Sequence, residues 1–181
     1  MDKKAECVII STFKDVNLYF SVGVSPSSGK IVRIGLPQDK REESIAEISN
    51  FYPHFKLRDD YQEVAEKISK AYNGENVDFD GEKLEKSNFK TPFQRKVLLE
   101  VAKIPYGETR TYKNIADNLK THGYRAVGSA IGKNPFPIVI PCHRVVRSDL
   151  TIGDYRGGSE MKKEILKREG VKISRHNITK K

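Results

Sequence analysis

Cys142 and His143 are neighbours, and Arg144 follows them, at the end of an apolar, proline-rich stretch that begins at Asn134. A thiol becomes a thiolate nucleophile at neutral pH when a base or a cation lies close to it, and this order supplies one candidate of each kind. A cysteine among apolar residues is more often an inert core residue, and sequence neighbours need not be partners in space. The three residues alone therefore leave nucleophilic catalysis and packing both open.

The stretch 134–146 contains three prolines, Pro135, Pro137 and Pro141. Each proline removes an N–H donor and disfavours the helical conformation of the residue before it. A continuous helix or a central strand is therefore excluded. We expect a buried, extended and rigid segment that presents Cys142 at its end.

The basic residues of the 181-residue chain are concentrated in its second half. Residues 1–85 carry 12 Lys and Arg against 16 Asp and Glu, a net charge of −4, whereas residues 86–181 carry 21 against 8, a net charge of +13. Uniform basicity would indicate only solubility or heat stability. Segregated positive charge favours a surface that binds the backbone of DNA or RNA.

Two cysteines, Cys7 and Cys142, are too few for a disulfide framework or a cysteine-rich zinc site, and the four histidines lack metal-ligand spacing. Neither a signal peptide nor an apolar run of membrane-spanning length is present. We expect a cytoplasmic protein (or a nucleoid or nuclear one, wherever the DNA is), with no membrane, metal or cofactor. Cys7 is interpreted as a structural thiol.

The first half, 1–85, predicts a small α/β scaffold domain without chemistry. Apolar segments at 8–13, 18–24 and 32–36 are typical of a small antiparallel sheet. Helices are expected at 41–50 and from about 60 to 72. The polar segment 75–87 then marks the boundary with a mainly helical domain at 86–181.

In the second half, Thr91 and Pro92 predict the start of a helix whose buried residues would be Phe93, Val97, Leu98 and Val101. Two short helices, from residue 112 to about 120 and from 124 to about 131, fit a helix-turn-helix motif, although an ordinary helical hairpin fits too. A last helix at 159–168 continues to Glu169. That carboxylate lies either on the inward side of the helix or at a frayed end.

The string Pro-Cys-His-Arg-Val after Asn-Pro resembles the active-site motif of the O6-alkylguanine-DNA alkyltransferases (methylated-DNA–protein-cysteine methyltransferases). Further segments occur in the family's order and approximate spacing: Thr111-Tyr112, Ile115-Ala116, Arg125–Gly128, Asn134-Pro135, Ile140–Val146, Tyr155 before Gly157-Gly158, and Glu169-Gly170. The resemblance covers roughly 91–170. It implies a ribonuclease H-like first domain and a winged-helix-like second domain. The zinc ligands that some members carry in the first half are absent from this sequence.

The resemblance implies DNA repair by direct damage reversal, as a single-turnover methylated-DNA–[protein]-cysteine S-methyltransferase. Cys142 would take the alkyl group of O6-alkylguanine, with O4-alkylthymine left open as a further substrate. His143 would accept the thiol proton through an ordered water, and Glu169 would orient the imidazole. Tyr112 would donate a proton toward the guanine ring.

The resemblance also implies how DNA would be bound. The partner would be double-stranded DNA containing O6-alkylguanine, bound by a monomer, with the target nucleotide flipped out of the stack. The DNA-binding residues would be Arg125, which fills the vacated place, with Ala126, Gly128 and Tyr112. The substrate pocket would comprise Asn134, Pro137, Val145, Tyr155, Arg156 and Gly157. Arg156 occupies a position where smaller side chains also occur in the family, so the range of accepted alkyl groups is left open.

Two other classes of protein remain as alternatives. A thiol hydrolase using Cys142 and His143 would turn over repeatedly and would have no use for a strongly basic half. A helix-turn-helix regulator would need a dimerisation segment, which the sequence does not show, and would be indifferent to Cys142.

Overall fold

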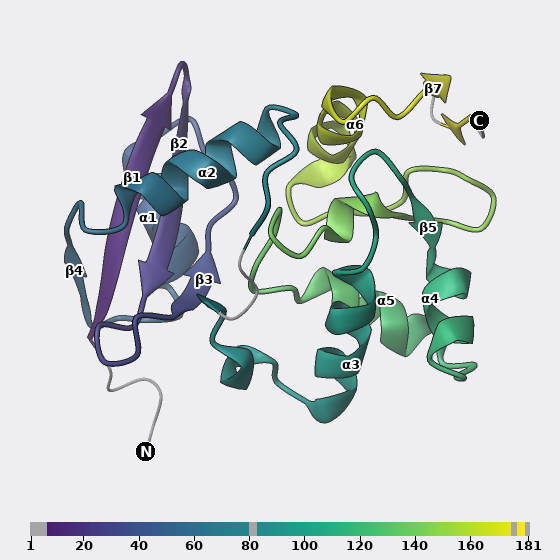
Figure 1. Cartoon of the computed structure of the whole chain (residues 1–181), viewed down its shortest axis with the longest axis horizontal. Coiled ribbons are helices and arrows are strands. Elements are labelled where there is room, and N and C mark those ends of the chain that lie inside the picture. The colour runs from purple at the N-terminus through teal and green to yellow at the C-terminus, as the bar shows by residue number, and fades with distance from the viewer. Residues whose placement is uncertain (1–6, 80–82, 175–176, 180–181) are drawn as a thin grey trace. The chain divides into compact units, whose positions relative to one another are not determined.

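The computed structural model describes residues 7–79, 83–174 and 177–179, and the chain forms two compact units (Figure 1). The first unit comprises residues 1–71 and 77–88, and the second comprises residues 72–76 and 89–181. The short segment 72–76 thus belongs to the unit that holds Cys142. No helix in the described part of the chain has the length and apolar character needed to cross a membrane.

A four-stranded sheet with the order β3-β2-β1-β4 forms the centre of the first unit. Its strands are β1 (Val8–Asp15), β2 (Leu18–Val24), β3 (Ile31–Ile34) and β4 (Phe55–Leu57). The first three pair antiparallel, as expected, but β4 pairs parallel to β1. The sheet is therefore mixed, and the expectation of a wholly antiparallel sheet is wrong. Three residues are too few for an alternating pattern to reveal the fourth strand.

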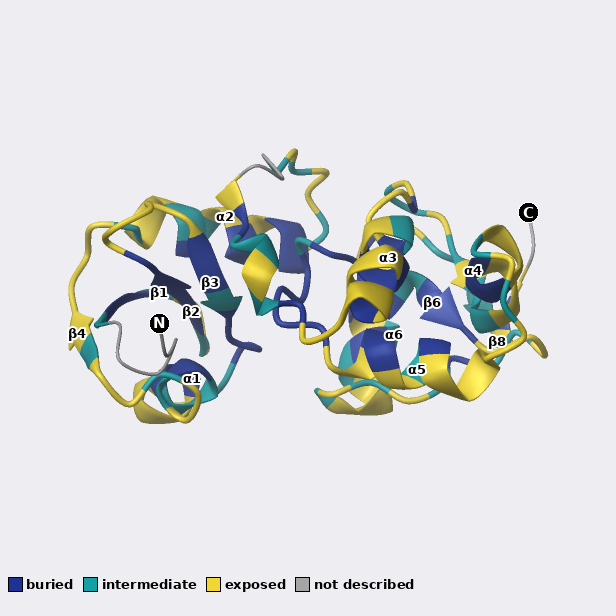
Figure 2. Ribbon diagram, turned by 90° about the horizontal axis from the view of Figure 1, so that it is seen from below, coloured by how far each residue is buried: buried dark blue, intermediate teal, exposed yellow. Residues whose placement is uncertain are grey.

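Helices α1 (Arg41–Ser49) and α2 (Gln62–Tyr72) lie on opposite sides of this sheet (Figures 1 and 2). The core under α1 consists of Val8, Ile10, Val32, Ile45 and Ile48. Burying such side chains stabilises the unit by about 1.5–3 kcal/mol each relative to leaving them in water. Both helices lie where the sequence predicts helices, α2 by its apolar periodicity.

The second unit is mainly helical, with α3 (Pro92–Val101), α4 (Tyr112–Asn118), α5 (Tyr124–Gly132) and α6 (Gly158–Arg168). Short strands accompany these helices: β5 (Arg110–Thr111) pairs parallel with β6 (Val145–Val146), and β7 (Ile173–Ser174) pairs antiparallel with β8 (Asn177–Ile178). The 3-10 turns are η3 (Lys86–Asn88), in the first unit, and η4 (Cys142–Arg144).

The start of α3 confirms one expectation and corrects another. The Thr91 hydroxyl accepts a hydrogen bond from the Gln94 backbone N–H at 3.0 Å, so Thr91 is the N-cap. Phe93, however, is 36% exposed, and Gln94 is buried in its place. The Gln94 amide donates to the carbonyls of Ala130 and Lys133 at the end of α5, and this polar contact turns Phe93 outward.

Helices α4 and α5 follow each other through the short connection 119–123. A reciprocal pair of hydrogen bonds between Thr111 and Asn114 caps the start of α4. Ile115 and Ala116 of α4 are buried, as are Val127, Ala130 and Ile131 of α5. The two predicted helices are therefore present.

The stretch from Asn134 to Ile140 is buried, with Val139 partly exposed, but the expectation that it is extended is wrong. Its backbone turns back on itself: Ile138 has a φ of +71°, and the Ile140 N–H donates to the Phe136 carbonyl at 2.8 Å. The Asn134 side chain closes this turn. Its amide donates to the Ile140 carbonyl at 2.8 Å, and its oxygen accepts from the Phe136 N–H at 3.0 Å. A side-chain amide thus supplies partners that the prolines do not.

Candidate active site

Cys142 opens the 3-10 turn η4, which leads directly into β6. Its thiol is buried, with 8% of the residue exposed, and Sγ accepts a hydrogen bond from the Asn134 side-chain amide at 3.2 Å. Burial raises the pKa of the thiol, while the Asn134 hydrogen bond and the positive charges of Lys162 and Arg156 act in the opposite direction. The resting group is a thiol that needs a base to become a nucleophile.

His143 is 1% exposed and lies against Glu169, with 2.8 Å between Nε2 and Oε1. Burial lowers the pKa of His143, against the opposing effects of the Glu169 hydrogen bond and charge. The imidazole is therefore neutral at pH 7. Because Glu169 can only accept at Nε2, the lone pair resides on Nδ1, which has no hydrogen-bond partner among the described residues. This free nitrogen is a base adjacent in sequence to the thiol.

Glu169 ends α6 on the inward side and is 5% exposed, so the frayed-end alternative is wrong. Arg144 holds it with two parallel hydrogen bonds, Nε to Oε2 and Nη2 to Oε1, both at 2.9 Å, and donates through Nη1 to the Ile104 carbonyl at 2.8 Å. Burial would raise the pKa of Glu169, but the hydrogen bonds from His143 and Arg144 outweigh it and hold the pKa below its usual value. Arg144, the cation that follows Cys142 and His143 in sequence, therefore binds the carboxylate of Glu169.

A hollow of about 630 Å³ lies over α4, α5 and the loop before α6. Its lining residues are Tyr112, Tyr124, Arg125, Gly128, Gly132, Arg147, Asp154, Tyr155 and Arg156. Five of the residues selected from the sequence are among them: Tyr112, Arg125, Gly128, Tyr155 and Arg156. Burial and the neighbouring Cys142 charge both raise the pKa of Tyr112 and of Tyr155, so both phenols remain protonated at neutral pH.

The other predicted residues belong to the same unit but do not line this hollow. Asn134, Pro137 and Val145 are buried, and Val145 forms the first residue of β6. Ala126 is exposed near the start of α5, and Gly157 is the N-cap of α6. The structure therefore brings the buried Cys-His-Glu line and the exposed helix α5 into one unit.

Lys162 of α6 is a residue that the sequence pattern did not single out. It is fully buried, and its Nζ donates to the carbonyl of Val145 at 2.6 Å. A signal was present, because positions 162, 165, 166 and 169 have the spacing of one helix face. The apolar residues Ile165 and Leu166 at two of these positions mark that face as inward.

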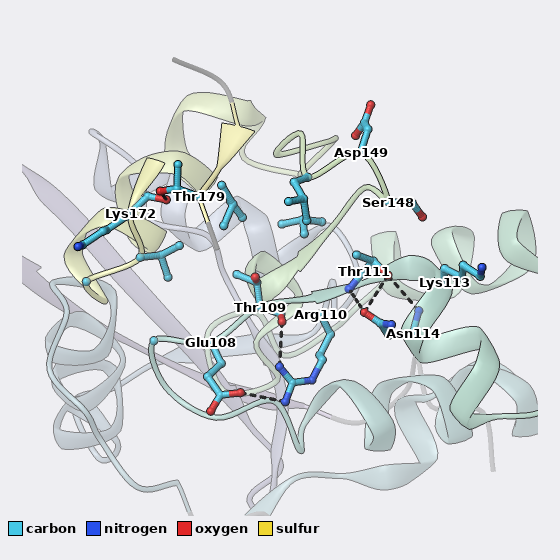
Figure 3. Close-up of a pocket in the computed structure, with 16 residues that line it drawn as sticks. Glu108, Thr109, Arg110, Thr111, Lys113, Asn114, Ser148, Asp149, Lys172 and Thr179 are labelled. Atoms are coloured by element: carbon cyan, nitrogen blue, oxygen red, sulfur yellow. Dashed lines mark hydrogen bonds and ion pairs between the residues drawn. The ribbon is translucent and has the colours of Figure 1, made fainter. Parts of the chain in front are cut away.

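A second hollow, of about 690 Å³, lies elsewhere in the same unit and contains none of the predicted site residues (Figure 3). Several of its polar side chains already bond to one another. Arg110 pairs with Glu108 at 2.9 Å, and Thr111 and Asn114 cap α4. Neither hollow is lined by Cys142, but the first is lined by Tyr112 and Tyr155, whose pKa values respond to the charge of Cys142, so the candidate site includes the first hollow.

Comparison with known proteins places the chain in a family. A family model described as the 6-O-methylguanine DNA methyltransferase DNA binding domain matches residues 92–171. The Mycobacterium tuberculosis protein OGT, solved in complex with DNA, superposes with a TM-score of 0.70 at 28% identity, covering 90% of this chain and 92% of that one. The α/β fold with a small mixed sheet and a helical unit is thus that of a methylguanine-DNA methyltransferase.

Two curated relatives carry the name methylated-DNA–protein-cysteine methyltransferase. The Saccharolobus islandicus protein is 44% identical over 119 residues, 64% of this chain and 75% of its own. The Candida albicans protein is 49% identical over 85 residues, 47% of this chain, and the match spans about half (48%) of its own length. The chain belongs to the methylated-DNA–protein-cysteine methyltransferase family.

Proposed function

We propose that the protein repairs DNA by direct reversal, moving the alkyl group of O6-alkylguanine onto its own Cys142. The observation that supports this most directly is the buried line of Cys142, His143 and Glu169, in which the imidazole is neutral and its Nδ1 is free. A neutral base next to a buried thiol can accept its proton, while burial, which raises the pKa of the thiol, keeps it mainly protonated at rest. Family membership supports the same reaction.

The proposed step is a displacement at carbon. His143 Nδ1 takes the thiol proton through a water, and the Cys142 thiolate attacks the alkyl carbon. The carbon–O6 bond breaks, its electron pair passes to the guanine ring, and Tyr112 donates its phenol proton to a ring nitrogen; Tyr112 is then reprotonated from solvent, to which His143 returns the thiol proton. Positioned general acids and bases contribute about 10²–10⁴-fold each to such steps. The product thioether has no leaving route, so each chain reacts once and needs no cofactor.

Helix α5 is the proposed contact with double-stranded DNA. Arg125 and Ala126 are exposed on it, and Arg125 lines the same hollow as Tyr112 and Tyr155. A Cβ placed on Gly128 would have Tyr112 Cε1 as its nearest neighbour, at 4.0 Å, so no packing within the protein demands this glycine. Close approach of a DNA backbone accounts for it instead. The modified nucleotide would flip into the hollow while Arg125 fills its place.

The remaining assignments concern the roles of the two domains, the lining of the pocket and the oligomeric state. We assign the chemistry and DNA binding to 86–181, which would be winged-helix-like, and a scaffold role to 1–85, which would be ribonuclease H-like. In the pocket, Val145 and Cys142 backbone groups would read the guanine amino group, Asn134 and Pro137 would shape the floor, and the loop with Tyr155, Arg156 and Gly157 would close over the base. A monomer in the cytoplasm or at the DNA is expected.

The test is the mass of the protein after incubation with duplex DNA that carries one O6-methylguanine. We expect a gain of one methyl group per chain, located on the Cys142 peptide, with no second turnover. The Cys142→Ala variant should gain nothing and still bind DNA.

Repeated turnover would favour the thiol hydrolase instead. An unmodified Cys142 in a folded, reduced protein would leave only DNA binding, as in the regulator alternative. A Cys7→Ser variant is the matched control, since it removes the other thiol and should react as the wild type does.

A further inference from the structure

Lys162 is a buried cation without an anionic partner. None of its atoms is exposed to solvent, and no carboxylate among the described residues lies within ion-pair distance of it. The backbone of Asp154 contacts Lys162, but the Asp154 carboxylate is 97% exposed and pairs with Arg147. Burying an ammonium is costly unless hydrogen bonds and a counter-charge compensate it. Packing alone therefore does not account for a buried ammonium at this position.

The hydrogen bonds of Lys162 join two segments that follow Cys142 in the chain. Nζ donates to the carbonyl of Val145 at 2.6 Å and makes a longer bond of 3.4 Å to the carbonyl of Asp154. Val145 in turn donates its N–H to the carbonyl of Cys142. A single residue, Val145, therefore links the ammonium of Lys162 to the backbone of the nucleophile. Asp154 directly precedes Tyr155, in the loop that lines the hollow.

The positive charge of Lys162 affects the pKa of the Cys142 thiol. It acts to lower the pKa of Cys142, and the Cys142 charge acts to raise the pKa of Lys162, which burial brings down to about 8. At neutral pH the amine therefore still carries its proton. The other titratable and charged groups around the pair are Tyr112, His143, Arg147, Asp154, Tyr155, Arg156 and Glu169.

We propose that Lys162 is a positioning residue for the transfer: its ammonium fixes the Val145 carbonyl beside the nucleophile and favours the thiolate of Cys142 over the thiol. The buried thiolate gains a counter-charge at the moment His143 removes its proton, and burial keeps that charge unscreened. Arg156, at the exposed rim, is screened by water in a way that Lys162 is not. This inference rests on the proposed function for its role in repair, but its effect on the thiol can be measured without DNA.

The experiment compares wild type, Lys162→Met and Lys163→Met by alkylation with iodoacetamide between pH 6 and 9.5, read as mass on the Cys142 peptide. Methionine keeps the length of the side chain and removes its charge and donors. We expect Lys162→Met to be alkylated about tenfold more slowly than the wild type at pH 6 to 7.5, where Lys162 still carries its proton, because each pH unit of lost thiolate stabilisation lowers the thiolate fraction tenfold. Lys163 is the matched control on the same helix, paired with the exposed Glu160, and its variant should keep the wild-type profile.

A folded Lys162→Met protein with an unchanged profile would overturn the proposal, as would an equal shift in Lys163→Met. If Lys162→Met does not fold, the wild-type alkylation profile is itself the test. The proposal requires the rate to level off as Lys162, with a pKa of about 8, loses its proton and to rise again at higher pH, because the thiolate then loses its counter-charge; a rate that rises smoothly through pH 8 would refute it. A Lys162-dependent thiol in a protein that takes no methyl group from DNA would instead sink the proposed repair function alone.

Discussion

At the scale of single residues, the site depends on one carboxylate that serves two partners. Glu169 receives the imidazole of His143 through one oxygen and the fork of Arg144 through both. A carboxylate facing only His143 would favour the imidazolium, which cannot accept a proton. The guanidinium neutralises much of that charge, so Glu169 orients His143 while burial keeps the ring neutral. Burial is thus the main reason that His143 is neutral, and Arg144 acts in the same direction.

The buried neutral state of His143 predicts how stability depends on pH. Its pKa in the folded protein is lowered by burial, whereas in the unfolded chain it is near 6.5. The unfolded state therefore binds more protons below about pH 6.5, and the free energy of unfolding falls as the pH drops from there through the folded pKa. Urea unfolding at pH 7.5 and 5.5 measures this loss, and the carboxylates stay ionised in that range. We expect a smaller loss in His143→Gln, and an equal loss in both proteins would contradict the assignment.

At the scale of elements, local signals predicted most helices, and long-range contacts decided what they missed. Thr91 with Pro92, and the apolar stripes of α2, α4 and α6, are readable because caps and periodicity act within a few residues. The turn at 134–140 was not readable, because it is closed by the Asn134 side chain and not by backbone pairing. Strand β4 forms only by pairing with β1, distant in sequence.

The same distinction applies to the candidate site. The adjacency of Cys142 and His143 makes both residues candidates from the sequence, and the family motif supplies Glu169, Tyr112 and Arg125. The bond from Asn134 to the thiol sulfur and the fork of Arg144 on Glu169 join residues through tertiary geometry, which the motif does not specify. The helical spacing of Lys162 relative to the buried Ile165 and Leu166 does indicate that Lys162 lies on the inward face of α6.

Helix α5 gives a prediction about Arg125. It is exposed and lines the hollow, so its removal leaves the Cys-His-Glu line intact. We expect Arg125→Ala to slow methyl transfer from duplex DNA by about tenfold to a hundredfold, because the flipped state loses the side chain that replaces the base. Reaction with the free O6-methylguanine base should be unaffected. Arg95→Ala, which removes an exposed arginine from α3, is the matched control; equal losses on duplex and free base would refute the flipping role.

At the scale of the whole molecule, the positive charge is concentrated in one half of the chain, and the reaction at Cys142 does not by itself require this. Residues 86–181 carry a net charge of +13, and residues 1–85 carry −4. A reaction at one buried thiol gains little from charges that lie far away on the surface, because salt screens them over about 8–10 Å. A polyanion that spans the surface gains from all of them. The distribution therefore fits a protein that must first find DNA and then search along it.

This division predicts how each stage of the reaction responds to salt. Binding to duplex DNA releases condensed counterions, so the logarithm of the association constant should fall linearly with the logarithm of the salt concentration, by about 0.9 for each phosphate contacted. Reaction with the free O6-methylguanine base displaces no counterions and passes only through the buried site, so its rate should stay constant over the same range. Both are measured between 50 and roughly 300 mM salt, a span over which several phosphate contacts cost about 10²–10⁴-fold in affinity. Salt-independent binding to duplex DNA would mean that the basic half has another partner, whereas a salt-dependent reaction with the free base would place exposed charges, and not Lys162, at the thiol.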